Sequence, residues 1–404
     1  MNKPKIRFNE FENIWTKSKL GELYEVYSGN TPSRSDDRNY QNGEIPWIKT
    51  TDLNNSIICS NEENISVYGA TKLKVLPEKS VLIAMYGGFN QIGRTGLLAY
   101  PATINQALAA LMPVNEINPN FLLNFLNFKK ESWRNVAASS RKDPNITKND
   151  VEKFKISFPS LDEQSAIGSL FRTLDDLLAS YKNNLANYQS LKVTMLSKMF
   201  PKAGQTVPEI HLDRFEGEWE EKCIGEIADI VRGASPRPIQ DPKWFDSNSE
   251  IGWLRISDVT SQNGRIHSLE QKISKLGQEK TRVLTEPHLL LSIAATVGKP
   301  VVNYVKTGVH DGFLIFMNPK FDREFMFQWL EMFREKWNRY GQPGSQVNLN
   351  SDIVKNQKIL IPSMEEQQAI GTYFSNLDNL ISAHQEKISQ LETLKKKLLQ
   401  DMFI

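Results

Sequence analysis

Residues 159–168 read Pro159-Ser160-Leu161-Asp162-Glu163-Gln164-Ser165-Ala166-Ile167-Gly168, and a close copy of this segment lies 203 positions later. The copy reads Pro362-Ser363-Met364-Glu365-Glu366-Gln367-Gln368-Ala369-Ile370-Gly371. The two segments stay in step without a gap as far as Met199-Phe200 and Met402-Phe403. Because chance does not produce a match of this length, the sequence indicates an internal duplication.

The duplication extends upstream of these segments. Trp15, Leu20-Gly21-Glu22, Gly29 and Pro32 return as Trp219, Ile224-Gly225-Glu226, Gly233 and Pro236. In the same way, Ile45-Pro46-Trp47-Ile48-Lys49 returns as Ile251-Gly252-Trp253-Leu254-Arg255. The 404 residues therefore divide into two modules of about 200 residues, each long enough to bury its own core.

Each copy of the segment predicts the start of a long helix. Pro159 and Pro362 disfavour helix on the N-terminal side, and Ser160-x-x-Glu163 and Ser363-x-x-Glu366 match the capping box. Apolar residues then recur at alternating steps of three and four, as in a coiled coil. The predicted helix interface consists of Leu174, Leu178, Tyr181, Leu185, Leu377, Ile381, Ile388 and Leu391, and it is interrupted at equivalent positions by Lys192 and Lys395.

We expect these two helices to pair with each other in antiparallel fashion, because the chain must return to begin the second module. The alternative is that each helix packs on its own lobe, but the regular heptad spacing favours the pair. The predicted fold is α+β: two mixed α/β lobes separated by two long antiparallel coiled-coil helices, with an internal pseudo-twofold repeat. The predicted domains are residues 1–158, 159–200, 201–361 with a linker at 201–215, and 362–404.

Composition and motifs restrict the class of protein. With 40% hydrophobic and 24% charged residues, the chain has the composition of a soluble globular protein. Its two cysteines, Cys59 and Cys223, have no partner at metal-ligand spacing and suit a reducing cytoplasm. We find neither a signal peptide nor a stretch long enough to span a membrane. Since phosphate-binding motifs, dinucleotide-binding motifs and catalytic triads are also missing from the sequence, we expect no catalysis.

Polar loops between the predicted strands are candidates for DNA contact. Arginine and amide side chains read base edges, and hydroxyls and cations bind phosphates. The net charge of only +2 requires that such contacts be local or shared with partners, and each loop taken singly could equally be a solvated turn. The candidates are Thr31, Ser33, Arg34, Lys49, Tyr86, Asn90, Gln91, Arg94, Ser139, Ser140, Arg141 and Lys142 in the first module, and Arg232, Ser235, Arg237, Arg255, Thr296, Lys299, Gln342, Ser345, Gln346 and Asn348 in the second.

The pattern Pro-x-x-x-Glu-Gln-x-x-Ile heads a long helix twice, each time after a lobe with Gly-x-x-Pro. In this the chain resembles, over essentially its whole length, the specificity subunit of type I restriction–modification systems. The resemblance implies two target-recognition domains that each read one half of an interrupted site in double-stranded DNA. It implies helices that set the spacer and dock two modification (methyltransferase) subunits, which two restriction (helicase/nuclease) subunits join. S-adenosylmethionine, ATP and Mg²⁺ would belong to these partners, with no cofactor in this chain. Base-reading residues cannot be carried over, because the recognition domains of the family vary too much.

Two other functions stay open at this point. The chain could be the recognition half of a fused, type II-like restriction and methyltransferase system, which predicts catalytic motifs that these residues lack. It could also be a coiled-coil scaffold without DNA contact, which predicts no salt-sensitive binding to duplex DNA.

Overall fold

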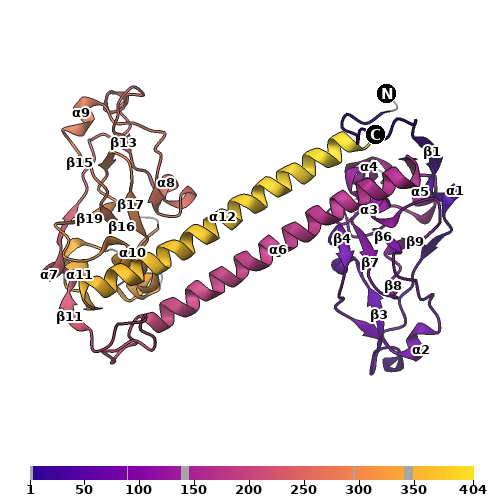
Figure 1. Ribbon diagram of the computed structural model, residues 1–404, viewed down its shortest axis with the longest axis horizontal. Coiled ribbons are helices and arrows are strands. Elements are labelled where there is room, and N and C mark those ends of the chain that lie inside the picture. Colours follow the sequence, from indigo (N-terminus) through magenta and orange to yellow (C-terminus); the bar gives the residue numbers. More distant parts are fainter. Residues whose placement is uncertain (1–2, 89, 138–144, 294–295, 341–348) are drawn as a thin grey trace. The chain divides into compact units, whose positions relative to one another are not determined.

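Each half of the chain forms a mixed lobe built on a five-stranded sheet (Figure 1). The structure, a computed structural model, describes residues 3–88, 90–137, 145–293, 296–340 and 349–404. The chain divides into two units, one of residues 1–183 with 385–404 and one of residues 184–384. Each unit therefore combines one lobe with segments of both long helices.

In the first unit the main sheet has the strand order β2 (Val26–Ser28), β9 (Leu108–Leu111), β6 (Val81–Ala84), β7 (Thr95–Leu98) and β4 (Ser56–Ile58). A three-stranded sheet has the order β5 (Asn64–Ile65), β3 (Ile45–Ile48) and β8 (Thr103–Ile104), and β1 (Thr16–Lys19) pairs with β10 (Lys155–Phe158). The lobe also contains α1 (Leu20–Leu23), α2 (Val67–Ala70), α3 (Pro119–Phe128), α4 (Lys130–Val136), α5 (Lys148–Lys153) and the 3-10 turns η1 (Asp37–Asn39) and η2 (Thr50–Asp52).

The second unit repeats this topology. Its main sheet has the order β12 (Asp229–Arg232), β19 (Phe313–Met317), β16 (Leu289–Ser292), β17 (Pro300–Asn303) and β14 (Arg265–Ile266). The strands β13 (Gly252–Trp253), β18 (Thr307–Val309) and β15 (Arg282–Leu284) form the three-stranded sheet, and β11 (Glu220–Cys223) pairs with β20 (Lys358–Ile361). The remaining elements are α7 (Ile224–Ile227), α8 (Ile256–Ser261), α9 (Lys275–Gln278), α10 (Arg323–Phe333), α11 (Ser351–Lys355), η3 (Pro242–Trp244) and η4 (Arg334–Tyr340). The predicted duplication and the mixed α/β lobes are thus confirmed. The three-stranded sheets differ in their outer strand: the pairing of β5 with β3 is reduced to a bridge between Gly252 and Lys272 in the second unit, and that of β15 with β18 is reduced to a bridge between Leu76 and Ala102 in the first.

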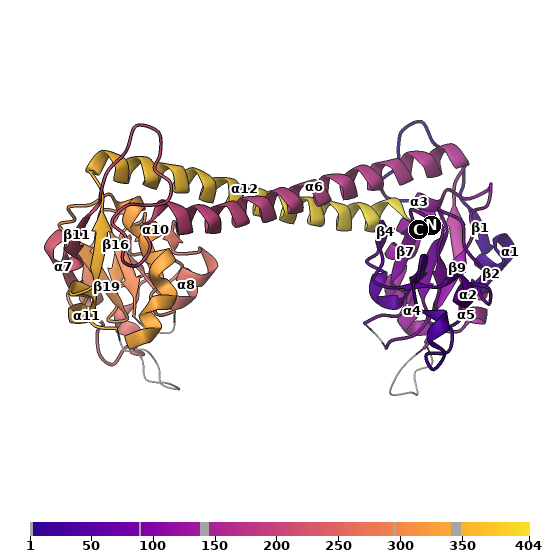
Figure 2. The same ribbon diagram turned by 90° about the horizontal axis from the view of Figure 1, so that it is seen from below.

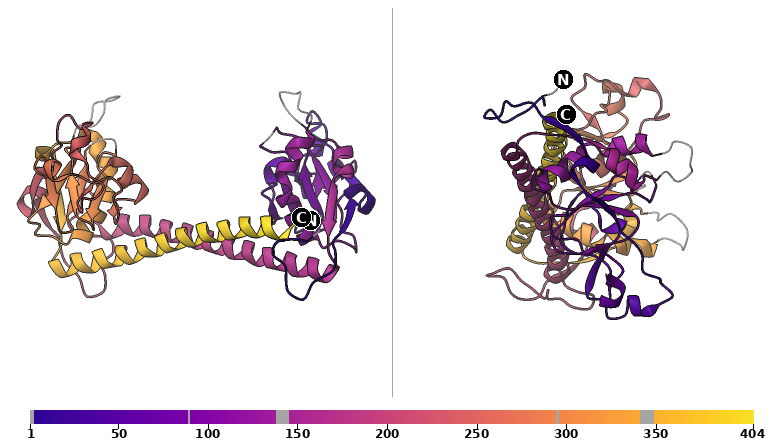
Figure 3. Two further views of the ribbon diagram at one scale, coloured as in Figure 1. Left: turned by 90° about the horizontal axis from the view of Figure 1, so that it is seen from above. Right: turned by 90° about the vertical axis from the view of Figure 1, so that its right-hand side faces the viewer.

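The main sheet is buried on both faces, which explains its continuous apolar runs. Along β6, Val81 and Ile83 pack into the core shared with α3, whereas Leu82 and Ala84 point into a second core on the other face. This division follows from the two-residue period of a strand. The same division occurs in β16, where Leu290 faces away from Leu289 and Leu291. In each unit the sheet lies on one side of the helix segments (Figures 2 and 3).

The long helices are α6 (Leu161–Met199) and α12 (Met364–Met402). In the first unit Leu174, Leu178 and Tyr181 of α6 share one core with Ile388 and Leu391 of α12. In the second unit the rings of Tyr188 and His384 lie 5.1 Å apart, and Leu377 is buried whereas Leu185 and Ile381 are half-buried. The predicted pairing of the helices is confirmed, although each helix head also packs on its own lobe through Phe171 or Phe374. Within the described residues, neither helix is apolar enough to cross a membrane.

The two lysines that interrupt the apolar spacing form equivalent ion pairs across the helices. Lys192 Nζ lies 2.5 Å from Asp378 Oδ1 in the second unit, and Lys395 pairs with Asp175 in the first. Both pairs are partly buried. Because shifting one helix by a residue would leave these charges without partners, the pairs specify the antiparallel register.

The heads of the long helices differ in one respect from the predicted capping box. Ser160 and Ser363 do cap the helices, since their hydroxyls accept hydrogen bonds from the backbone N–H groups of Glu163 and Glu366. The glutamate side chains, however, reach elsewhere: Glu163 accepts two 2.7 Å hydrogen bonds from Arg7, and Glu366 lies 2.8 Å from His211 Nδ1. The reciprocal arm of the capping box was therefore a wrong prediction, because partners distant in sequence compete for both carboxylates.

The glutamine that follows each of these glutamates joins the helix head to the lobe. Gln164 accepts a hydrogen bond from the backbone N–H of Asn118, just before α3, and donates to the carbonyls of Pro159 and Glu116. Gln367 makes the matching contacts with Asp322 and Pro362. Both glutamines are buried, so the repeated Glu-Gln pair has a structural role in each module.

The segment that precedes each module is also repeated. Ile6 donates a backbone hydrogen bond to Asp401 near the end of α12, and Ile210 donates one to Lys198 near the end of α6. Arg7 and His211 follow directly and contact Glu163 and Glu366. Residues 201–215, predicted as a linker, thus include a segment packed in the same way as the N-terminal one, a relation that the sequence comparison starting at Trp15 missed.

Candidate nucleic-acid interface

The Gly-x-x-Pro motif of each lobe lies against the backbone of a neighbouring turn. A Cβ at Gly29 would overlap the carbonyl oxygens of Ile104 and Asn105, and one at Gly233 would overlap that of His310. Glycine is therefore required at both positions because two backbone segments approach closely there. The motif holds the loop after β2 or β12 onto the turn between β8 and β9 or between β18 and β19.

This contact brings a hydroxyl to the tip of the turn. Thr31 donates a hydrogen bond to Gln106 Oε1 in the first lobe, and Ser235 donates one of 2.8 Å to Asp311 Oδ1 in the second. Thr31 and Ser235 are equivalent in the repeat and were both predicted as site residues. Gln106 and Asp311 were not predicted from the sequence. The equivalence of the two turns is the signal that could have found them.

A second turn, between β6 and β7, borders the first one. Met85 donates a backbone hydrogen bond to Ala107 and accepts one from Ile146, so residues 85, 107 and 146 lie together. The predicted residues Tyr86 and Asn90 are exposed on this turn, and Gln91 and Arg94 are half-buried. Gly93, at φ +73°, packs on the indole of Trp133, which keeps the turn close to α4.

The second lobe has the same arrangement between β16 and β17. Ile293 donates a backbone hydrogen bond to Gly312, and Gly298, at φ +77°, packs on Trp337 in η4. Thr296 donates to the hydroxyl of Ser292 (3.1 Å), and Lys299 pairs with Glu331 at 2.7 Å. The structure thus brings the predicted turn residues of each lobe to one edge of its sheet, next to the Gly-x-x-Pro loop.

Several predicted cations already have carboxylate partners within their lobe. Besides the Lys299–Glu331 pair, these are Arg34 with Glu63 and Arg237 with Asp311, both at 2.5 Å, Arg255 with Asp258 at 2.9 Å, and Lys49 with Glu63 at 3.3 Å. Arg34 also lies over the rings of Tyr40 and Trp47. Arg232 donates through Nε to the Asp311 carbonyl, whereas Ser33 contacts Ser35. A phosphate would have to compete with these partners, so these side chains are poorer candidates than their charges suggested.

Some predicted residues lie outside the described part of the chain. These are Ser139, Ser140, Arg141 and Lys142 in the first lobe, and Gln342, Ser345, Gln346 and Asn348 in the second. The described residues contain no group of His, Cys, Asp and Glu side chains suited to a metal ion.

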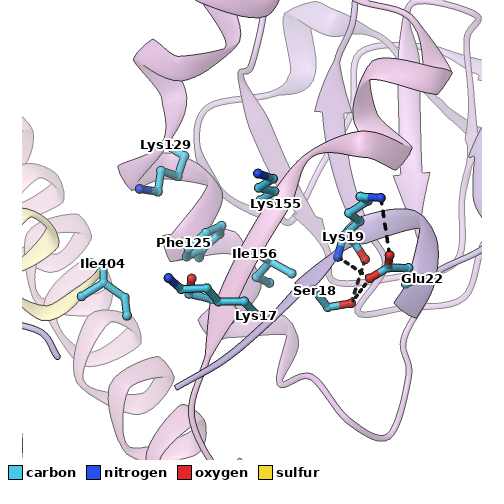
Figure 4. A pocket seen from close by; sticks show the side chains of 10 residues that line it. Lys17, Ser18, Lys19, Glu22, Phe125, Lys129, Lys155, Ile156 and Ile404 are labelled. Atoms are coloured by element: carbon cyan, nitrogen blue, oxygen red, sulfur yellow. Dashed lines mark hydrogen bonds and ion pairs between the residues drawn. The ribbon is translucent and has the colours of Figure 1, made fainter. Parts of the chain in front are cut away.

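The first lobe has a further basic surface that the second lobe does not repeat. A cavity of about 500 Å³ is lined by Lys17, Lys19, Lys129 and Lys155 around Phe125 and Ile156 (Figure 4). Glu22 in this cavity is held by Ser18 and by the backbone N–H of Lys19. Glu221 and Cys223 occupy the positions equivalent to Lys17 and Lys19 in the second module. The cavity is therefore not part of the arrangement common to both lobes.

Two lobes with one scaffold and different side chains at the same edge define a duplicated recognition protein. A family model described as "Type I restriction modification DNA specificity domain" matches the chain twice, at residues 12–190 and 216–393. The chain belongs to this family and is a DNA-recognition subunit that does not itself catalyse a reaction.

Individual relatives align with this chain over nearly its whole length. The type I restriction enzyme MjaVIII specificity subunit of Methanocaldococcus jannaschii is 21% identical and covers 95% of this chain and 91% of its own. The MjaIX specificity subunit of the same organism is 23% identical, with the same coverage. The crystal structure of the S subunit from M. genitalium shares the fold, with a TM-score of 0.67 and 15% identity over 100% of this chain and 99% of that one.

Proposed function

We propose that each lobe reads one half of an interrupted DNA site and that the helix pair sets the length of the spacer. The observation that supports this most strongly is the repeated edge, where the same backbone arrangement carries different side chains in the two lobes. A rigid scaffold with variable loops is the usual design of a recognition module. The chain would act in the cytoplasm with double-stranded DNA and with modification and restriction subunits.

An exchange of lobes tests this proposal. We expect that replacing residues 1–158 with the equivalent lobe of a relative changes one half-site and leaves the other intact, because each lobe has its own cores. Sequencing the methylated bases of cells that express the variant with its methyltransferase measures both half-sites. A four-residue insertion in α6, which adds about 6 Å, serves as the matched variant and should change only the spacer. An exchange that altered both half-sites would contradict independent reading.

The helices carry two equivalent apolar patches that suit two copies of one partner. In the first unit Leu177 and Leu394 are 39% and 44% exposed, and the ion pairs Lys182–Glu392 and Asp175–Lys395 bring them to the same level. In the second unit Leu191 and Leu380 are equally exposed and lie near the pair Lys192–Asp378. All four occupy the same heptad position, next to the helix interface. We infer that each patch docks one modification subunit, and that two restriction subunits join that complex.

Charges placed on one patch should remove one modification subunit. We expect Leu177→Asp with Leu394→Asp to weaken docking at that patch at least about 30-fold, because exposed leucines that become buried are replaced by charges. Native mass spectrometry of the co-expressed complex should then show one bound subunit instead of two. Leu191→Asp with Leu380→Asp should give the same mass from the other patch. Asn183→Asp, on the outer surface of α6, is the control and should keep both subunits; retention of two subunits by both double variants would refute the docking surface.

We also propose that S-adenosylmethionine, ATP and Mg²⁺ are held by the partner subunits. The support is the absence of binding motifs for these groups from the sequence. Titration calorimetry of the purified chain with S-adenosylmethionine or with ATP should show no heat of binding. Micromolar binding of either compound would argue against a non-catalytic chain.

A further inference from the structure

Gln106 and Asp311 occupy the same position in the two lobes but differ in chemistry. Gln106 lies at the tip of the turn between β8 and β9, and Asp311 lies at the tip of the turn between β18 and β19. Each is joined to its own Gly-x-x-Pro loop by the equivalent hydroxyl, that of Thr31 or that of Ser235. The scaffold is repeated, therefore, and the functional group that it holds at the tip changes from an amide to a carboxylate.

Both side chains are accessible to solvent. Gln106 is exposed, and the side chain of Asp311 is 36% exposed. The hydroxyl uses only part of the hydrogen-bonding capacity of either group, since an amide offers two donors and one acceptor and a carboxylate has two acceptor oxygens. A hydroxyl that restricts the rotamer of an exposed side chain orients it toward a ligand at a low cost in entropy on binding.

The surroundings of Asp311 suit a carboxylate that approaches DNA. Arg237 lies 2.5 Å from one carboxylate oxygen, and Arg232 donates to the backbone carbonyl of Asp311. Burial alone would raise the pKa of Asp311, but the Ser235 hydroxyl and the charge of Arg237 outweigh it, so the pKa is lowered. The carboxylate stays ionised at neutral pH, while the two arginines offset its repulsion from phosphates.

The neighbouring His310 holds the tip of this turn in place. Its Nδ1 accepts a 2.8 Å hydrogen bond from the backbone N–H of Gly312, and its ring packs against Phe313 and Trp253. Burial lowers the pKa of His310, which keeps the ring neutral and able to accept that bond. Asp311 therefore projects from a turn of defined conformation.

We propose that Gln106 and Asp311 are specificity-determining residues that contact base edges, Gln106 in the first half-site and Asp311 in the second, with Thr31 and Ser235 as positioning residues. The inference rests on the proposed function of the two lobes. An amide bonds bidentately to N6 and N7 of adenine, whereas a carboxylate accepts from N4 of cytosine and is repelled by the acceptors on guanine. Gln106 thus selects adenine at one position of its half-site, and Asp311 selects cytosine in the other.

Isosteric substitutions test the inference. In the full chain, assembled with its modification subunit, Gln106→Glu converts the amide to a carboxylate and Asp311→Asn does the reverse. Binding is measured on duplexes that carry every single-base change of the recognised site. We expect Gln106→Glu to lose about 10- to 100-fold discrimination at one position of the first half-site, with the second half-site unchanged, and Asp311→Asn to show the converse. Asn115→Asp and Glu250→Gln make the same chemical changes at exposed positions away from these turns. They should leave the relative affinities for this panel of duplexes unchanged.

Other outcomes would overturn the inference. A fall in affinity that is uniform across the panel would identify a phosphate contact, and an unchanged panel would remove any reading role. Changes in the wrong half-site, or an assembled variant that binds no duplex, would also contradict it. If a variant fails to assemble, Gln106→Ala or Asp311→Ser replaces it on the same panel. If the wild-type chain itself showed no preference for a two-part site, the proposed function would fail. That result differs from variants whose relative affinities match those of the wild-type chain, which would refute only the inference.

The positioning residues have a separate readout. Ser235→Ala should reduce discrimination at the Asp311 position while binding to unrelated duplex stays the same, and Ser235→Thr should restore it. Equal weakening on specific and unrelated duplexes would assign Ser235 a merely structural role.

Discussion

Replacing Phe403 with alanine should destabilise the first unit by about 3–5 kcal/mol, although this residue lies at the far end of the second module. Phe403 is 3% exposed, and its ring lies 5.4 Å from that of Phe121 and 5.8 Å from those of Phe128 and Phe171. The side chain thus completes the core of the first lobe, and its removal leaves a cavity that the surrounding rings cannot fill.

Amide hydrogen exchange resolves this effect because it reports each unit separately. Exchange should accelerate in β6 and α3 and stay unchanged in β16 and α10. Phe200→Ala is the matched variant, since Phe200 lies 5.3 Å from Phe325 and 5.9 Å from Trp219 in the second unit. It should accelerate exchange in β16 and α10 instead. If Phe403→Ala affected both units equally, or neither, its role as a core residue of the first unit would be refuted.

Arg7→Ala should lower the free energy of unfolding by a similar amount, about 3–5 kcal/mol, because it leaves a buried carboxylate without a partner. Glu163 is only 1% exposed and receives two 2.7 Å hydrogen bonds from the Arg7 guanidinium. A neighbouring ion pair provides the control. Lys5 is 81% exposed and pairs with Asp401 at 3.5 Å, so Lys5→Ala should cost less than about 1 kcal/mol.

Urea denaturation of Arg7→Ala and Lys5→Ala measures this difference in stability. The combination Arg7→Met with Glu163→Leu removes both charges and should recover most of the stability, since an apolar pair of similar size replaces a buried ion pair at little cost. Like Arg7→Ala, His211→Ala should be destabilising, here in the second unit, because it removes the hydrogen-bond partner of the buried Glu366 carboxylate. An Arg7→Ala variant as stable as Lys5→Ala would show that Glu163 is solvated.

Local patterns in the sequence were sufficient to predict the long helices and the duplication. Apolar residues at steps of three and four and a serine at each helix start are properties of neighbouring residues, and the helices indeed run over Leu161–Met199 and Met364–Met402. The repeat could be recognised because both copies retain the residues that join helix head to lobe, such as Gln164 and Gln367. Lys192 and Lys395 could be recognised as interruptions of the apolar spacing, but not as members of ion pairs.

Partners distant in the chain could not be read from spacing. Glu163 turns away from its own helix start toward Arg7, 156 positions earlier, and Lys192 is balanced by Asp378, 186 positions later. The candidate interface arises in the same way. Gln106 and Asp311 become notable only once the close backbone contacts at Gly29 and Gly233 bring a hydroxyl to each turn. Periodicity and capping are short-range effects that a sequence displays directly, whereas the pairing of charges and the convergence of loops depend on which strands and turns the folded core brings together.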